Sequence, residues 1–116
     1  MQEEHKELIN QSLLVWGRQA QFDQLHEELG ELIVALNHYK RNRCTLKDVA
    51  VEIADVRLML NAIQIVLGVD ENEYAAIEEG QWAKWKSQLE KSIKNQQEVY
   101  KPIQQIFRES LGAKDE

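Results

Sequence analysis

Two pairs of acidic residues stand out because each pair has the same three-residue spacing. Glu28 and Glu31 form the first pair, and Glu52 and Asp55 form the second, about twenty residues later. Residues three positions apart lie on one side of a helix, one turn from each other. Each helical segment would therefore present two carboxylates on a single side.

The surroundings of the second pair make it unusual. At roughly 100° per residue, Glu52 and Asp55 share a sector with apolar residues that we expect to face a core. Carboxylates in such a place are costly unless a positive group meets them. Four acidic groups converging from two helices would form an oxygen-rich cage suited to a hard cation such as Mg²⁺. For the first pair, an ordinary solvated helix face is the alternative. The apolar neighbours of the second pair are Val49, Val51, Ile53, Val56, Leu58, Met59, Leu60, Ile63, Val66 and Leu67.

The elements that must position these carboxylates are predicted to be helices. Apolar residues recur every three or four positions without strand-type alternation, and one proline and five glycines leave little material for turns. Thr45 and Asp48 have the spacing of a capping box, and Gly68 is a suitable stop for the helix that they open. Pro102 is expected to interrupt the last helix. The predicted helices span residues 2–15, 18–41, 45–67, 71–98 and 103–111, and Trp16-Gly17 marks a bend or break between the first two. The predicted apolar face of the helix over 18–41 consists of Phe22, Leu25, Leu29, Leu32, Ile33 and Leu36.

The predicted fold is all-α, a four-to-five-helix bundle formed by a single domain of 116 residues. Residues 1–15 form its N-terminal helix, and residues 99–116 form a short C-terminal helix with a fraying tail. The helix over 45–67 is apolar on nearly every side, and a single chain of this size can hardly bury all of these sides by itself. We therefore expect a second copy to complete the core, in a dimer or a dimer of dimers.

The composition limits the function classes. A net charge of −6 disfavours a protein that binds the backbone of polymeric nucleic acid. The single cysteine, Cys44, permits no internal disulfide and fits a reducing cytoplasm. No apolar run approaches the ~18 residues of a membrane span, so no membrane association is expected.

The carboxylate pairs and the residues before them resemble those of the MazG-like, all-α nucleoside triphosphate pyrophosphohydrolases. The resemblance covers residues 12–95, most of the chain. It implies a Mg²⁺-dependent enzyme, with Mn²⁺ as a substitute, that cuts (deoxy)nucleoside triphosphates between the α and β phosphates and so cleans nucleotide pools. It also implies that Glu28, Glu31, Glu52 and Asp55 are the metal ligands. The matching residues are Trp16-Gly17, Gln21, Gln24, the run Glu27-Glu28-Leu29-Gly30-Glu31-Leu32, Ala35 and the run Glu52-Ile53-Ala54-Asp55-Val56.

Further residues are candidates for contact with the substrate. The family often has a lysine and an arginine on the following helix; Lys84 matches the first, and Lys91 stands in place of the second. Arg43 is a third candidate cation. The candidate proton acceptor is either a metal-bridging carboxylate or a neighbouring one such as Glu27. The alternative for each cation is an ordinary surface position.

Aromatic and amide side chains are candidates for contact with a nucleoside. Trp16 is a candidate for base stacking, whereas Trp82 and Trp85 have the spacing of core or dimer contacts. Gln21 and Gln24 lie on the carboxylate side, where they are either ligands of a base or sugar or plain helix-face residues.

Other classes remain in competition with this reading. A ferritin-like di-iron bundle requires Glu-x-x-His, which the chain lacks, and the zincin-like start at His26 has no second histidine. A non-catalytic helical module that binds nucleotides or a basic partner through an acidic face is the main alternative. It predicts neither metal dependence nor nucleotide turnover.

Overall fold

The computed structural model describes residues 1–112, apart from the side chains of residues 99–101. All regular secondary structure in this part of the chain is helical, as the sequence predicts. The chain divides into unit 1, Met1–Asp70, and unit 2, Glu71–Glu116, which are described separately below. The predicted tail after Gly112 lies outside the described residues.

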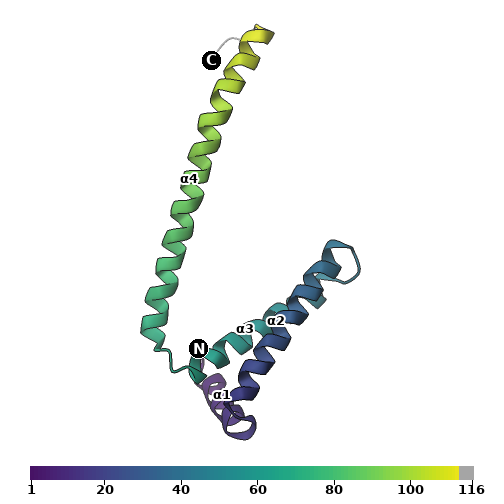
Figure 1. Ribbon diagram of the computed structural model, residues 1–116, viewed down its shortest axis with the longest axis vertical. Helices are drawn as coiled ribbons and strands as arrows, with labels where there is room; N and C mark the ends of the chain where they lie inside the picture. Colours follow the sequence, from purple (N-terminus) through teal and green to yellow (C-terminus); the bar gives the residue numbers. More distant parts are fainter. Residues whose placement is uncertain (113–116) are drawn as a thin grey trace. The chain divides into compact units, whose positions relative to one another are not determined.

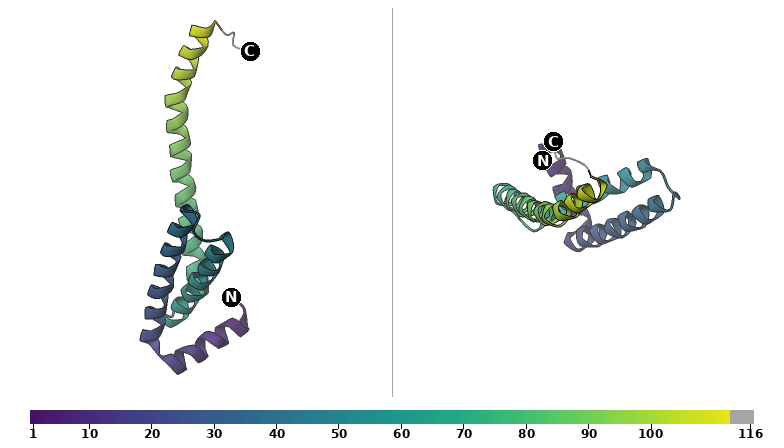
Figure 2. Two further views of the ribbon diagram at one scale, coloured as in Figure 1. Left: turned by 90° about the vertical axis from the view of Figure 1, so that its right-hand side faces the viewer. Right: turned by 90° about the horizontal axis from the view of Figure 1, so that it is seen from above.

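Unit 1 contains three helices, α1 (Glu3–Trp16), α2 (Arg18–Lys40) and α3 (Leu46–Val66). The helices α2 and α3 lie side by side and run in opposite directions (Figure 1). The shorter α1 crosses the end of this pair at which α2 begins and α3 ends (Figure 2). The predicted break at Trp16-Gly17 is confirmed, because Gly17 alone separates α1 from α2.

Local chemistry explains where α3 begins and ends. At its start, the Asp48 amide donates to Thr45 Oγ1 over 3.2 Å and the Thr45 amide donates to Asp48 Oδ2 over 2.9 Å, which confirms the predicted capping box. At its end, Gly68 adopts a positive φ of 69°. The Val69 amide then bonds to the carbonyl of Gln64 in a Schellman motif. The predicted stop at Gly68 is therefore confirmed.

The core of unit 1 is small and lies where α1 crosses the other two helices. Ile9 of α1 packs with Met59 and Ala62 of α3, and the half-buried Leu25 and Ile65 cover this group. Further buried positions continue along α3 at Val49, Val56 and Val66.

Polar contacts hold α1 and the start of α2 in place. The buried Gln21 amide donates to Ser12 Oγ over 3.3 Å, and Ser12 Oγ donates to the Ile9 carbonyl over 2.7 Å. The Arg18 guanidinium donates to the Val66 carbonyl over 3.1 Å, so the first residue of α2 caps the last turn of α3. These bonds join all three helices at one end of the unit.

The face of α2 that packs on α3 differs from the face that the apolar pattern predicts. Leu29, Ile33 and Leu36 belong to the predicted apolar face but are 38%, 61% and 42% exposed. Gln21 is instead buried and Glu28 half-buried. The contact face is therefore rotated toward the carboxylate side, and part of the apolar face of α2 remains open to solvent.

The described residues of unit 2 form a single long helix, α4 (Glu71–Leu111). The predicted interruption at Pro102 is wrong, because the helix continues through this residue. Proline removes one backbone hydrogen bond and crowds the preceding turn, but the hydrogen-bond ladder persists on both sides. Apolar residues on both sides of Pro102 also share one face of the helix, as described below.

Candidate metal centre and adjoining groove

Three of the four predicted metal ligands come together between α2 and α3. Glu28, Glu31 and Glu52 each contribute a carboxylate oxygen, and these three oxygens lie within 4.8 Å of one another. We call these residues the carboxylate cluster. The antiparallel packing of α2 on α3 produces this convergence, because it brings the i, i+3 pair of α2 against Glu52.

Two oxygens of the cluster are buried without a hydrogen-bond partner. These atoms are Glu28 Oε2 and Glu52 Oε2. The other oxygen of Glu28 accepts a hydrogen bond of 2.7 Å from the Gln24 amide. A buried carboxylate oxygen without a donor is costly, since its hydration is lost and nothing replaces it. The cluster therefore has the polar atoms that a positively charged ligand would satisfy.

The electrostatic interactions within the cluster also favour a positively charged ligand. The pKa of Glu31 is raised above its ordinary value of 4.5. The largest cause is the neighbouring Glu28 carboxylate, and loss of hydration and the Glu52 carboxylate follow. Glu31 itself is exposed to solvent. The three like charges thus repel one another in the absence of a counter-charge.

The donor set fits a hard divalent cation. All three ligands are carboxylates, which Mg²⁺ and similar ions prefer over nitrogen or sulfur. Exposed acidic groups are common without an ion, and what distinguishes this cluster is the burial of its two unpartnered oxygens. A cation at this place would therefore bind the two oxygens that lack a donor and would reduce the repulsion among the three carboxylates.

The fourth predicted ligand, Asp55, is not among the three converging carboxylates. It lies one turn after Glu52 on α3, and both side chains are half-buried. Glu27, one of the candidate proton acceptors, is exposed and lines a hollow of about 550 Å³ together with Glu31 and Glu52. The structure thus places Glu27 beside the cluster.

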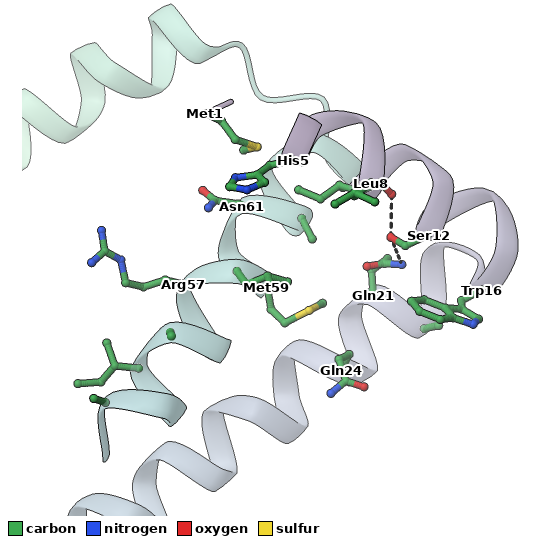
Figure 3. Close-up of a pocket in the computed structure, with 17 residues that line it drawn as sticks. Met1, His5, Leu8, Ser12, Trp16, Gln21, Gln24, Arg57, Met59 and Asn61 are labelled. Atoms are coloured by element: carbon green, nitrogen blue, oxygen red, sulfur yellow. Dashed lines mark hydrogen bonds between the residues drawn. The ribbon is translucent and has the colours of Figure 1, made fainter. Parts of the chain in front are cut away.

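A larger groove of about 1140 Å³ lies along α1, α2 and α3 (Figure 3). Three of the predicted substrate-binding residues line it, namely Trp16, Gln21 and Gln24. Trp16 stands at the junction of α1 and α2 and is 71% exposed. Gln24 lines the groove and donates to Glu28, so it connects the groove to the carboxylate cluster. Gln21 also lines the groove, although its amide is held by Ser12.

Other polar residues of the groove were not among the predicted site residues. His5, Arg57 and Asn61 all line it. Arg57 and Asn61 are four residues apart within the apolar run of α3, and this spacing of polar residues is the signal that sequence reasoning could have used. His5 carries no such signal, because its place in the groove depends on how α1 folds back.

The two predicted phosphate contacts on α4 belong to unit 2. Lys84 and Lys91 are both exposed there. Their contact with a substrate stays a prediction.

The fold and the site together define a class: an all-helical unit, within the described residues, that carries a cluster of carboxylates suited to a cation beside an open groove. No protein-family model, curated protein or solved structure matches the chain. None of the described helices combines the length and the apolar character that crossing a membrane requires.

Proposed function

We propose that the protein is a Mg²⁺-dependent pyrophosphohydrolase that converts (deoxy)nucleoside triphosphates to monophosphates and pyrophosphate. The observation that carries this proposal is the pair of buried, unpartnered oxygens of Glu28 and Glu52 within a cluster of three carboxylates. The resemblance of the carboxylate motifs to those of MazG-like enzymes supplies the reaction. The neighbouring groove supplies the space for a nucleoside.

In this proposal, Glu28, Glu31 and Glu52 hold the metal, and Asp55 joins them as the fourth carboxylate. Mg²⁺ held by these residues would supply positive charge to the phosphate oxygens and would make the attacking water more acidic. Gln24 fixes the orientation of Glu28 through its 2.7 Å hydrogen bond. The Glu27 carboxylate, which lies beside the cluster, accepts the proton of the attacking water.

The groove provides the contacts to the rest of the substrate. Trp16 offers an exposed ring on which a base can stack, and Gln24 and Asn61 offer amide groups for hydrogen bonds to a base or sugar. Lys84 and Lys91 are the proposed phosphate contacts from α4.

We further propose that the active form is a homo-oligomer. Within unit 1, large apolar side chains on one side of α3 remain open, including Ile53 at 43% exposure and Leu60 at 50%. A face of this kind is rarely left uncovered in a stable monomer.

The test is a panel of nucleoside triphosphates incubated with Mg²⁺, with pyrophosphate and orthophosphate measured separately. We expect pyrophosphate and the monophosphate in equal amounts, and no orthophosphate. Glu52→Gln and Asp55→Asn should abolish turnover while the helical circular dichroism is retained. Glu7→Gln removes one exposed charge of α1 and serves as the matched control with normal turnover. Full activity in either site variant would refute the proposed site.

The alternative is a helical module that binds nucleotides or a basic partner without turnover. The exposure of Glu27 and Glu31 on the acidic face of α2 is the observation that favours it. Such a module would release neither pyrophosphate nor orthophosphate in the same assay.

A further inference from the structure

The helix α4 carries an apolar stripe, which Gln96 interrupts between Ile93 and Ile103. At roughly 100° per residue, its members lie within a sector of about 80° on the helix surface. All of them are exposed; Trp82 and Trp85, for example, are 60% and 61% exposed. The ring centroids of these two tryptophans are 5.4 Å apart, so they form one aromatic patch. The stripe consists of Trp82, Trp85, Leu89, Ile93, Ile103, Phe107 and Leu111.

Such a helix needs a partner surface. Most helical stability in water comes from packing an apolar face rather than from helix propensity. The opposite side of α4 is polar, with Lys84, Ser87 and Lys91 among its residues. The stripe is therefore narrow and one-sided, as in helices that pair along a seam.

The charges along α4 indicate what that partner is. Four glutamates and no basic residue occupy positions 71–79, whereas four lysines and one glutamate occupy positions 84–94. Of these lysines, Lys86 lies at the edge of the stripe, and the other three lie farther round the helix. Two copies of α4 in parallel would set acidic segment beside acidic segment and basic beside basic. Two copies in antiparallel orientation set each acidic segment beside the basic segment of the other copy, which is favourable on both sides of a two-fold axis.

We propose that α4 pairs with the α4 of a second copy of the chain in antiparallel orientation, with the Trp82–Trp85 patches of the two helices in contact at the two-fold axis. In this register the paired part of α4 covers residues 71–96, and Ile103, Phe107 and Leu111 lie beyond it. Glu79 of one copy lies near Lys86 of the other, along the same edge of the stripe. Ala75 of one copy likewise lies near Ile93 of the other. The proposal rests on unit 2 alone and does not depend on the proposed catalytic function.

The first test is the association state of the full-length chain by sedimentation equilibrium. We expect a dimer or a dimer of dimers, and we expect Leu89→Lys to weaken association at least about 100-fold by placing a charge in the seam. Ser87→Lys adds the same charge on the opposite side of α4 and should leave association unchanged. A monomeric wild type, or unchanged association of Leu89→Lys, would overturn the proposal; in the latter case another surface holds the copies together.

The second test measures orientation by disulfide formation in the Cys44→Ser background. Chains with Ala75→Cys alone or Ile93→Cys alone should not cross-link with themselves. A mixture of the two should form the crossed dimer. Self-cross-linking of each single variant would indicate parallel helices, and the absence of all cross-links would indicate a different interface; both results contradict the proposal.

The third test addresses the charges. Lys86→Glu should weaken association about tenfold, because an attraction becomes a repulsion at two symmetric places. Adding Glu79→Lys should restore association, since the pair is then re-formed with its signs exchanged. Failure of the second change to restore association would contradict the antiparallel register.

Discussion

Glu52→Gln should make the metal-free protein more stable while removing its response to Mg²⁺. In the wild type, Glu28 Oε2 and Glu52 Oε2 are buried without a donor, and Glu31 adds a third negative charge within 4.8 Å. The glutamine keeps the size of the side chain, removes one of the three charges and introduces an amide that can donate to Glu28. The same change removes a ligand from the proposed ion.

The magnitude follows from the two buried oxygens. A buried acceptor left without a partner costs about 1–3 kcal/mol. Supplying one donor should therefore raise the free energy of unfolding by about 1–2 kcal/mol in the absence of metal. For a folding unit of this size, each kcal/mol corresponds to about 4–8 °C in Tm. In the wild type, Mg²⁺ at a hundred times its Kd should add about 2.7 kcal/mol.

The assay is thermal and urea unfolding of the wild type and the variant, each in EDTA and in a series of Mg²⁺ concentrations. In EDTA the variant should unfold at the higher temperature. As Mg²⁺ rises, the wild type should overtake it, and the variant should stay constant. Glu7→Gln, which removes a charge from the exposed part of α1, should follow the wild type in both conditions.

The reasoning would be refuted by a wild-type Tm that does not change with Mg²⁺, since the cluster would then hold no ion. It would also be refuted by a variant that is less stable than the wild type in EDTA. In that case the buried oxygens of Glu28 and Glu52 would have partners other than a metal.

Three further predictions concern protons and the helix cap. Mg²⁺ affinity, measured by titration calorimetry, should rise with pH as Glu31 loses its proton, and Glu31→Gln should flatten this rise; an affinity independent of pH would contradict it. Because the pKa of Glu31 is raised in the folded state, metal-free stability should fall as pH rises from the ordinary value of 4.5 through that folded pKa. Thr45→Ala should lower the free energy of unfolding by about 1 kcal/mol, whereas Thr45→Ser should retain it, as measured by urea unfolding. Equal losses in both variants would show that the capping hydroxyl is not the cause.

Much of unit 1 could be predicted from local sequence signals. Thr45 and Asp48 marked the start of α3, Gly68 marked its end, and Gly17 marked the break after α1. These signals act through bonds between residues close in sequence, so the sequence alone contains them. The i, i+3 spacing placed Glu28 and Glu31 on one side of α2 for the same reason.

The remaining features depend on contacts that are distant in sequence. The apolar pattern of α2 indicated one face, but the face that packs on α3 is shifted toward Gln21 and Glu28. Which of two adjacent faces is covered depends on the partner helix, and the pattern of one helix does not contain this information. The place of His5 in the groove depends in the same way on the crossing of α1.

Pro102 shows a different limit of sequence reasoning. Proline is a reliable sign of a helix end only where no other force continues the helix. The apolar residues Ile93, Ile103 and Phe107 keep the same side of α4 on both sides of it. The sequence shows that these apolar residues keep their helical spacing across Pro102, and this spacing indicates a continuous helix more reliably than the proline indicates its end.

The single residue between α1 and α2 also restricts how α1 can be placed relative to α2. Gly17 has φ 86° and ψ 171°, a conformation that side chains disfavour, and nothing else intervenes between the two helices. With no loop between the two helices, α1 could change its angle to α2 only by rotation about Gly17, and such a rotation would have to break the hydrogen bond between Gln21 and Ser12. A ligand in the groove would therefore meet a wall whose position Gly17 and this hydrogen bond fix together.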